Sequence, residues 1–457
     1  MSLKPSLPQG TRDFSSEIVY MRAFIFNTIK SVFELYGFQP LETPAMENVE
    51  TLMGKYGEEG DKLIFKILNN GLDNPNKAEA TKKGFENILE GKTDKSITER
   101  ALRYDLTIPF ARYVAMNRGT LTFPYKRFQI QPVWRADKPQ RGRYREFYQC
   151  DADVVGSNSL LYEVELAQIY ATAFDKLKVP VEIHINSRKL LTALAELCGA
   201  QDKLTSITIA IDKLDKIGLE KVKAELLGRG LLEHQVAIVE KYLSIDGDNS
   251  SKLAQLANLV DGNESAIAGL KEIQFLLGHL TEEMQASIVV DQTLARGLDY
   301  YTGIIFEVKA KDVQMGSIGG GGRYDNLTGL FGVDGISGVG VSFGIDRIYD
   351  VMDELQLFPE DASKSCNILI LNLGEEEGRV AFSIATSLRS HGIPAEVYPD
   401  ITKFDKQFNY GKKKNFQYLV IVEENELSDN TCKIKDMKYN KQETISINDL
   451  ISFFESK

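Results

Sequence analysis

The chain has 457 residues, of which 43% are hydrophobic and 26% charged, a balance typical of a globular protein with more than one domain. No stretch approaches the roughly 20 consecutive apolar residues that a membrane-spanning helix needs, and the N-terminal residues lack the basic-then-apolar order of a secretory signal. The four cysteines and four histidines lie far apart, with no CxxC pair and no two histidines four residues apart. We therefore predict a cytoplasmic protein with reduced thiols, no membrane contact and no metal site built from its own side chains.

The net charge of −11 disfavours nucleic acid as a partner, but the basic residues are concentrated in two segments. Residues 125–146 contain seven basic and two acidic residues, and residues 401–416 contain five lysines and one aspartate. Each segment is compatible with a solvated basic face, which is the favoured interpretation of the second segment by itself. Two basic segments on an acidic chain nevertheless indicate a polyanion that the protein contacts at two places.

The N-terminal third predicts a helix, an insertion and several strands. Apolar residues recur on one helical face over 17–36, before Gly37. The polar residues 69–98 predict a surface insertion without an assigned role. A strand pattern at 63–68 precedes this insertion. Strand and helix patterns resume after it, at 102–116, 127–136 and 144–156.

The rest of the chain divides into a helical part, further strands and a second domain. Residues 188–285 are mostly helical in pattern, and strands return at 288–310 and 338–343. A change in composition near 357–365 marks a linker, after which strand and helix patterns alternate as βαβαβ. We predict a first domain over 1–362 with a helical insertion over 188–271, and a small α/β domain over 363–457.

Four segments combine charged residues with strand-like surroundings. In the first, Arg135 ends one strand and Arg143 begins the next, and arginine forks suit bidentate binding of phosphate. A surface hairpin with weak ion pairs explains these residue types equally well. Farther along, Gln149, Asp151 and Asp153 alternate, so all three face one side of a sheet.

The second segment places Asp105 and Thr107 two residues apart, where they could hold an ammonium group or where Asp105 could pair with a nearby arginine. The third has glycines over 319–322 before Arg323 and Tyr324. Such a run permits close approach of the backbone to a ligand. A flexible linker is the plainer alternative, but linkers seldom lie between hydrophobic strands. The run does not fit the dinucleotide-binding fingerprint.

The fourth segment is a glycine-rich strand that leads into a helix with Arg347 in its first turn, a place that attracts anions. A further arginine, Arg296, stands in the mostly apolar residues 294–308, where burial is costly without a negative partner. The segments together offer arginines for phosphates, acids for a cation and tyrosines for a polar ring. They indicate a substrate with an ammonium group and a nitrogen-containing ring, and a polyphosphate co-substrate.

At this point the chain resembles a known family. RGLDYYTG at 296–303 and GGGGRYDNL at 319–327 resemble the signature pair of the histidyl-tRNA synthetases. The Arg135 segment and GVGVSFGIDR at 338–347 resemble the second and third class II synthetase motifs. Residues 17–55 resemble the first, which in the family builds a dimer interface. The resemblance covers nearly the whole chain in the family's order, and the class I signatures HIGH and KMSKS are absent.

The resemblance implies an α+β catalytic domain over 1–362 with a mixed, mainly antiparallel sheet, and an α/β anticodon-binding domain over 363–457. It implies that Arg296 and Arg135 are catalytic, with Arg296 at the α-phosphate of ATP. Its implied ATP site, with Mg²⁺ bound to the nucleotide, consists of Arg135, Asp137, Arg143 and Arg347. Its implied histidine site consists of Asp105, Thr107, Gln149, Asp153, Arg296, Tyr301 and Tyr324. Its implied tRNA-binding residues are Lys412, Lys413 and Lys414.

The implied function is that of a homodimeric histidine–tRNA ligase, which activates L-histidine with ATP and transfers it to tRNA(His). Two departures from the family's pattern are Asp137, where many members carry glutamate, and the length of the 69–98 insertion. One rival is a non-catalytic paralogue, such as a regulatory subunit of ATP phosphoribosyltransferase, but such proteins lack the anticodon-binding domain. Another is a different class II synthetase, which RGLDYY disfavours.

Overall fold

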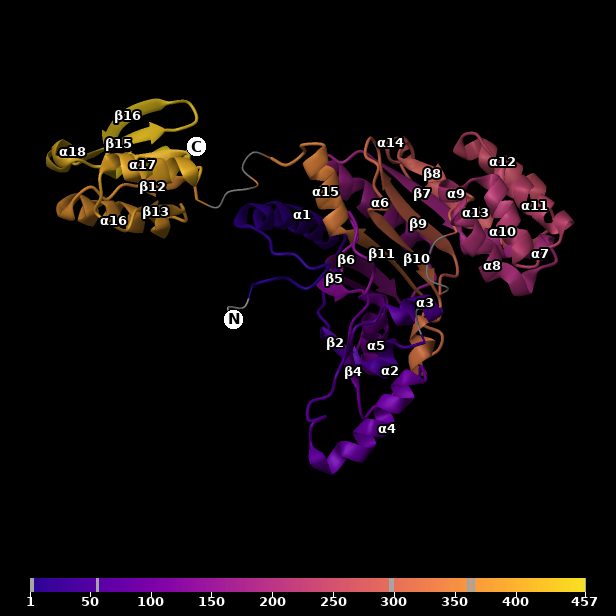
Figure 1. Cartoon of the computed structure of the whole chain (residues 1–457). Coiled ribbons are helices and arrows are strands. Elements are labelled where there is room, and N and C mark those ends of the chain that lie inside the picture. Colours follow the sequence, from indigo (N-terminus) through magenta and orange to yellow (C-terminus); the bar gives the residue numbers. More distant parts are fainter. Residues whose placement is uncertain (1–3, 55–56, 296–299, 360–361, 363–365, 457) are drawn as a thin grey trace. The chain divides into compact units, whose positions relative to one another are not determined.

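The computed structural model describes the chain except for residues 1–3, 55–56, 296–299, 360–361, 363–365 and 457 (Figure 1). It forms two compact units. One comprises Met1–Phe14 and Met21–Phe358, and the other comprises Ser15–Tyr20 and Pro359–Lys457.

The first unit is built on an eight-stranded sheet in the order β1-β5-β6-β11-β10-β9-β7-β8 (Figure 1). Its strands are β1 (Gln39–Pro40), β5 (Tyr125–Trp134), β6 (Glu146–Val155), β7 (Val181–Ser187), β8 (Ile288–Val290), β9 (Ile304–Ala310), β10 (Gly319–Tyr324) and β11 (Gly338–Gly344). The pairs at the two edges, β1–β5 and β7–β8, are parallel, and the inner pairs are antiparallel. The predicted mixed, mainly antiparallel sheet is confirmed.

Two helices, α1 (Ser16–Leu35) and α6 (Leu161–Lys176), cover one face of this sheet. Ile25, Ile29 and Phe33 of α1 are fully buried, and the ring of Phe33 lies 5.7 Å from that of Phe343 in β11. Complete burial of each such side chain contributes about 1.5–3 kcal/mol. The apolar face predicted for 17–36 is therefore the face that packs on the sheet.

The other face of the central strands is polar. In β6, Cys150, Ala152 and Val154 point to the apolar core, so the alternate residues face the opposite side. The side chains on that side, with their directly opposed partners in β5, are Gln149 with Gln131, Asp151 with Gln129, and Asp153 with Arg127. The neighbouring strands β11 and β10 present Gly340, Ser342, Gly344, Gly320 and Gly322 at the corresponding positions. The glycines leave space above the centre of the sheet, and the site described below occupies it.

Gly340 has no room for a side chain, because Asp153 packs directly against it. A Cβ atom at Gly340 would lie 1.9 Å from Oδ1 of Asp153 and 3.0 Å from the carbonyl oxygen of Ala152. We expect Gly340→Ala to lower the free energy of unfolding by about 1–3 kcal/mol, because two strands must shift to accept the methyl group. Urea denaturation measures this loss. The matched control is Gly320→Ala on the same face, where the nearest atom would lie 3.4 Å away, and an equal loss in both variants would contradict the steric explanation.

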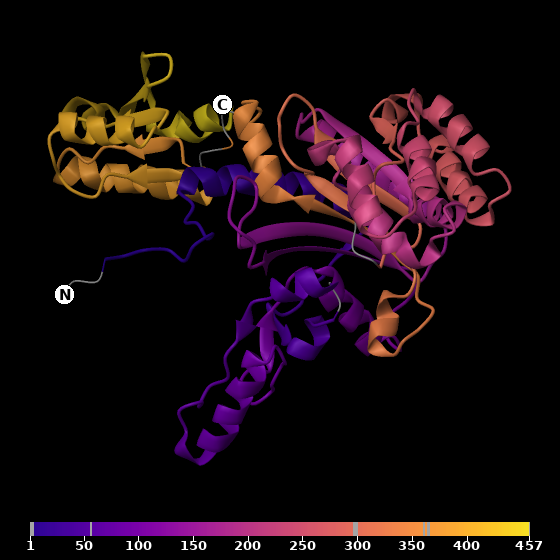
Figure 2. The ribbon, with the colours of Figure 1, turned by 45° about the vertical axis from the view of Figure 1, so that its right-hand side comes forward.

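The segment before the central strands differs in part from the prediction. The strand predicted over 63–68 is much shorter, because only β3 (Lys66–Ile67) pairs, in a small sheet with β2 (Met46–Asn48) and β4 (Arg100–Leu102). The polar insertion contains a 3-10 turn, η1 (Pro75–Lys77), and a helix, α4 (Ala78–Leu89), which lies away from the large sheet in both views (Figures 1 and 2). Two short helices, α2 (Val49–Leu52) and α3 (Gly57–Lys62), precede it, and α5 (Thr107–Asn117) follows β4.

A bundle of helices connects β7 to β8 at one edge of the sheet (Figures 1 and 2). Its elements are α7 (Arg188–Leu197), η2 (Gln201–Lys203), α8 (Leu204–Ile211), α9 (Leu214–Ile217), α10 (Leu219–Gly228), α11 (Glu233–Leu243), α12 (Asn249–Leu259), α13 (Glu264–Gly278) and α14 (Glu282–Gln285). The helical pattern read over 188–285 is thus present. After β10 come a 3-10 turn, η3 (Leu327–Phe331), and, beyond β11, helix α15 (Ile345–Glu354).

The second unit contains a five-stranded sheet in the order β13-β12-β14-β15-β16. Its elements are β12 (Ile368–Ile370), α16 (Glu375–Ser390), β13 (Ala395–Val397), α17 (Phe404–Lys413), β14 (Tyr418–Ile421), α18 (Glu424–Asp429), β15 (Thr431–Asp436), β16 (Lys441–Ser446), η4 (Ile447–Asp449) and α19 (Leu450–Glu455). Its first five elements have the predicted βαβαβ order, with β12 parallel to both β13 and β14. None of the helices described in either unit is long and apolar enough to cross a membrane.

Candidate active site

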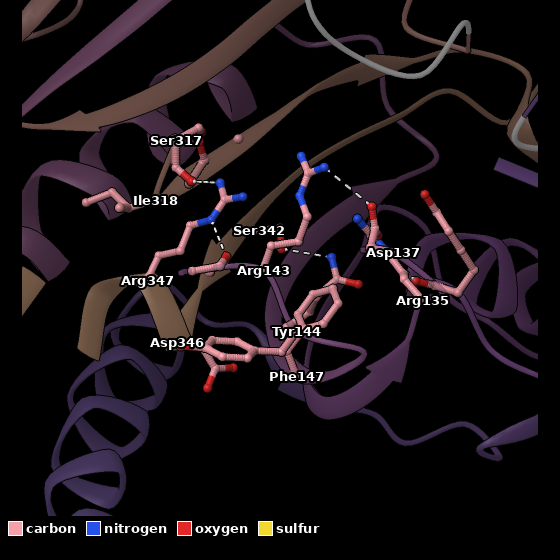
Figure 3. A pocket seen from close by; sticks show the side chains of 16 residues that line it. Arg135, Asp137, Arg143, Tyr144, Phe147, Ser317, Ile318, Ser342, Asp346 and Arg347 are labelled. Atoms are coloured by element: carbon pink, nitrogen blue, oxygen red, sulfur yellow. Dashed lines mark hydrogen bonds and ion pairs between the residues drawn. The ribbon is translucent and has the colours of Figure 1, made fainter. Parts of the chain in front are cut away.

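A cavity of about 340 Å³ opens on the polar face of the large sheet (Figure 3). The loop between β5 and β6 and the start of β6 line one part of it, and residues at β10, β11 and the start of α15 line another. Arg135, Arg143 and Arg347 all line it, together with Asp137 and Gln149. Three guanidinium groups around one cavity make it a candidate site for a polyanion.

Arg135 is held between aromatic rings. Its guanidinium carbon lies 4.3 Å from the ring centroid of Tyr104 and 5.1 Å from that of Phe147. Its Nε donates a hydrogen bond to the carbonyl oxygen of Tyr104 at 3.0 Å. Because two rings and a carbonyl oxygen hold the Arg135 side chain in this way, the group is fixed before any ligand arrives, which lowers the entropy cost of binding.

Arg347 is fixed by the backbone of two loops. Its Nε donates to the carbonyl oxygen of Gly142 at 2.8 Å, and its Nη1 donates to that of Ser317 at 2.5 Å (Figure 3). The preceding residue, Asp346, pairs with the buried Arg22 at 2.6 Å and also with Arg12. The start of α15 is therefore tied both to α1 and to the loop between β5 and β6, which places Arg347 at the cavity.

Arg143 and Asp137 face each other across the loop between β5 and β6. Nη1 of Arg143 lies 3.5 Å from Oδ1 of Asp137, and about half of the Arg143 side chain is exposed (Figure 3). Such a pair contributes at most about 1 kcal/mol. Arg143 can therefore leave Asp137 for a phosphate at small cost.

Beside the cavity, an inner cluster of acids and tyrosines lies on the same sheet face. Oδ2 of Asp153 pairs with Nη2 of the fully buried Arg127 at 2.8 Å, and its Oδ1 accepts a hydrogen bond from the hydroxyl of Tyr324 at 2.6 Å. Burial raises the pKa of Asp153, and Arg127 and the Tyr324 hydroxyl partly offset that rise. The ring of Tyr300 lies 4.8 Å from that of Tyr301. Burial also raises the pKa of Tyr301, so this phenol is neutral at physiological pH.

Asp105 and Thr107 complete the inner cluster at the start of α5. Asp105 is buried, and its Oδ1 accepts from the backbone nitrogen of Ile108 at 3.1 Å. The hydroxyl of Thr107 is hydrogen-bonded to Tyr300, and the negative charge of Asp105 is felt by both Tyr300 and Tyr301. Acids and phenols thus gather beside the cavity that the three arginines line, and such a cluster suits a cation rather than a second anion.

Most residues predicted for the site are brought together. Arg135, Asp137, Arg143, Gln149 and Arg347 line the cavity, and Asp105, Thr107, Asp153, Tyr301 and Tyr324 belong to the inner cluster beside it. Arg296 lies outside the described residues. Lys412, Lys413 and Lys414 lie at the end of α17 in the second unit and are exposed.

The sequence did not single out several residues that the fold adds to the site. Tyr104 and Phe147 hold Arg135, and Arg127 holds Asp153. Asp151 was recognised as facing the same side as Gln149 and Asp153 but received no role. Strand alternation thus placed Asp151 on the correct face, whereas no local pattern predicts that Tyr104 packs on Arg135.

Comparison with known proteins decides the family. A family model described as histidyl-tRNA synthetase matches residues 85–348, and one described as anticodon binding domain matches residues 367–457. A histidine–tRNA ligase of Bacteroides fragilis (strain YCH46) is 51% identical over 452 residues, which is 99% of each chain. The chain belongs to the histidyl-tRNA synthetase family. The predicted family and the prediction of an aminoacyl-tRNA ligase are confirmed.

Solved structures agree with this membership. The crystal structure of a histidyl-tRNA synthetase from Nostoc sp. PCC 7120 matches with a TM-score of 0.82 and 27% identity over the full length of both chains. A Bacillus halodurans protein titled ATP phosphoribosyltransferase regulatory subunit/histidyl-tRNA synthetase matches with a TM-score of 0.70 over 92% of this chain and 99% of that one, at 19% identity. That likeness shows the shared fold alone, and the full-length ligase relatives favour a synthetase over the regulatory-subunit alternative.

In the basic segment 401–416 of the second unit, the aromatic residues and the lysines have different surroundings. The rings of Phe404 and Phe408 stack 5.7 Å apart, and the hydroxyl of Tyr410 donates to Glu396 at 2.6 Å. These aromatic residues pack against the apolar core of that unit. The lysines after them are exposed, so they, rather than the rings, are available to a polyanion.

Proposed function

We propose that this member of the histidyl-tRNA synthetase family is a histidine–tRNA ligase that works in two steps. Histidine and ATP first form histidyl-adenylate and pyrophosphate, and the histidyl group then passes to the 3′ end of tRNA(His). The observation that carries the proposal is the placement of three fixed or lightly held arginines directly beside a buried cluster of acids and tyrosines on one sheet face.

ATP binds in the cavity, with its triphosphate among Arg135, Arg143 and Arg347. Arg143 exchanges its weak pairing with Asp137 for a phosphate, while Arg135 and Arg347 are already in place. Mg²⁺ enters with the nucleotide, as the substrate MgATP.

Histidine binds in the inner cluster. Its ammonium group is held by Asp105, Thr107 and Gln149, and its ring by Asp153 and Tyr301, with Tyr324 closing the pocket. In the first step, a carboxylate oxygen of histidine forms a bond to the α-phosphorus, and the bond from that phosphorus to the bridging oxygen breaks, so pyrophosphate leaves. The cations around the phosphates stabilise the charge that develops on their oxygens.

The remaining parts of the proposal concern the partners and the domains. Lys412, Lys413 and Lys414 contact the phosphate backbone of tRNA, for which their exposure and charge are suited. We retain the predicted division into a catalytic domain over 1–362, with its insertion over 188–271, and an anticodon-binding domain over 363–457. The homodimer and the cytoplasmic location also stay predictions.

The experiment that tests the function is ATP–pyrophosphate exchange with each of the twenty amino acids. We expect exchange with histidine alone. A pocket that hydrogen-bonds both ring nitrogens rejects analogues that lack them by roughly 10⁴–10⁵-fold. Exchange with a different amino acid, or with none, would contradict the proposal.

Arg296 can be tested although it lies outside the described residues. We expect Arg296→Ala to reduce kcat of histidine-dependent exchange by roughly 10²–10³-fold, because a positive charge at the α-phosphate acts mainly in the transition state. The KM values of ATP and histidine should change far less. Exchange close to that of the unmodified enzyme would remove Arg296 from the catalytic residues.

A further inference from the structure

Asp151 is a buried carboxyl group in the middle of the proposed histidine site. Its side chain is only 2% exposed, and it lies on β6 between Gln149 and Asp153, on the same face as both. Side chains on one face of a strand are about 6.6 Å apart. Because Gln149 is proposed to hold the ammonium group and Asp153 the ring, a ligand that reaches from one to the other passes over Asp151.

The hydroxyl of Ser342, directly opposite on β11, is hydrogen-bonded to the Asp151 carboxyl group, but three acceptor atoms in this region have no donor. Oδ1 of Asp151, Oε1 of the opposed Gln129 and Oε1 of Gln149 are buried and accept no hydrogen bond from the described residues. The donor nitrogen of Gln129 is already used, since it donates to Oγ1 of Thr43 at 2.8 Å. A buried acceptor without a donor destabilises the empty pocket, so three of them together point to a ligand that brings several N–H groups.

The charged groups around Asp151 favour the binding of a cation. Among the residues that the structure describes, the ionisable groups that act on it are Arg127 on β5, Asp153 on β6 itself, Asp105 before α5, and the neutral phenols of Tyr301 and Tyr170. Within this described set, three carboxyl groups, Asp151 included, share one guanidinium group. Burial above all, with the charge of Asp153, raises the pKa of Asp151 to about 7. A bound cation would lower that pKa and leave the carboxylate ionised.

Both oxygens of Asp153 already have partners, Arg127 and Tyr324, whereas Oδ1 of Asp151 does not. We propose that Asp151 is a further specificity-determining residue, whose carboxylate accepts a hydrogen bond from the ring of bound histidine and thereby selects the protonated imidazolium ring over a neutral ring of the same shape. This inference rests on the proposed function, because it assigns the ring to the same pocket.

The proposal has a pH dependence with a definite sign. The ring of free histidine has a pKa of about 6.5, close to that of Asp151 in the empty pocket. In the complex, the histidine ring and the Asp151 carboxyl group together hold one proton. Above pH 7 the free ring and the free carboxyl group have both lost their proton, so binding must take up a proton from solution. The KM of histidine therefore rises with pH. The same rise is not expected for an analogue whose ring does not take up a proton.

The test compares L-histidine with 1,2,4-triazolyl-alanine, which has the same ring shape but stays neutral near pH 7. We would measure both KM values by pyrophosphate exchange at saturating MgATP, between pH 6.5 and 8.5. A charge-assisted hydrogen bond predicts that the analogue has a KM about 10- to 100-fold higher than histidine at pH 7. In Asp151→Asn this ratio should fall to within about 3-fold, while the KM of ATP and the kcat at saturating histidine stay within about 3-fold of the unmodified enzyme.

The matched control is Glu307→Gln, a buried carboxyl of the same sheet in β9, which should keep the original ratio. An unchanged ratio in Asp151→Asn would overturn the inference while leaving the proposed function intact. Absence of histidine-dependent exchange in the unmodified enzyme would instead overturn the proposed function. Should Asp151→Asn fail to fold, the unmodified enzyme still decides, because equal KM values and parallel pH profiles for the two amino acids would overturn the inference.

Discussion

Replacing Arg135 with alanine is expected to reduce kcat/KM for histidine-dependent pyrophosphate exchange by roughly 10²–10³-fold. Arg135 is held by Tyr104 and Phe147 before substrate binds, so its charge is available to the phosphates without reorganisation. Alanine removes this charge and leaves two aromatic rings around a void. Steady-state exchange kinetics with ATP and histidine varied in turn measure the effect.

The matched control for this prediction lies in the same loop. Arg141 is largely exposed and pairs with Glu354 at the surface, away from the cavity. We expect Arg141→Ala to retain kcat/KM within about 3-fold, because an exposed ion pair contributes little. If both variants lose activity equally, the effect comes from the loop as a whole and not from the guanidinium of Arg135.

Deleting residues 366–457 is expected to separate the two half-reactions. The described residues of the proposed site for ATP and histidine all precede this segment, and the segment has an apolar core of its own that includes Ile368, Ile370 and Val420. Pyrophosphate exchange should therefore stay within about 3-fold of that of the full chain. Aminoacylation of tRNA(His) should fall by roughly 10²-fold or more, because the contacts of this domain with the RNA are lost. Paired assays of exchange and aminoacylation on one preparation measure both.

A full-length variant serves as the control for the deletion. Replacing Lys412, Lys413 and Lys414 with alanine should weaken aminoacylation and reduce its dependence on salt, since fewer counterions are released on binding. Exchange should not change. Equal loss of exchange and aminoacylation in the truncated protein would contradict the proposed division into domains.

Much of the fold follows from local patterns. The apolar period of 17–36 predicts a helix that buries one face, and α1 does so through Ile25, Ile29 and Phe33. Alternation in 144–156 predicts which side chains of β6 share a face, because successive residues of a strand point in opposite directions. The glycines of 319–322 predict a close approach of backbone, and their position within a central strand follows only from pairing with β9 and β11.

The predictions were weaker where distant contacts decide the outcome. The strand predicted over 63–68 keeps only two paired residues, because its neighbour β4 is itself short. The polar insertion contains a helix, α4, that its composition did not indicate. Whether an apolar run pairs as a strand depends on a partner elsewhere in the chain, which a local pattern does not contain.

The arginines show most clearly what the sequence determines by itself and what the tertiary structure decides. The motifs around Arg135, Arg323 and Arg347 identify the family and the kind of ligand, because such residue types at such spacings are specific. They do not tell which arginine is available to that ligand. Arg323 is buried and paired with Glu163, 160 residues away, with Nη2 to Oε2 at 2.7 Å, whereas Arg135 and Arg347 line the cavity, Arg135 against the ring of Tyr104 and Arg347 with hydrogen bonds to the carbonyl oxygens of Gly142 and Ser317. An arginine held by a buried carboxylate, as Arg323 is by Glu163, is not available to a phosphate, whereas Arg143 in its exposed pair with Asp137 is, and only the folded chain decides which kind of pair forms.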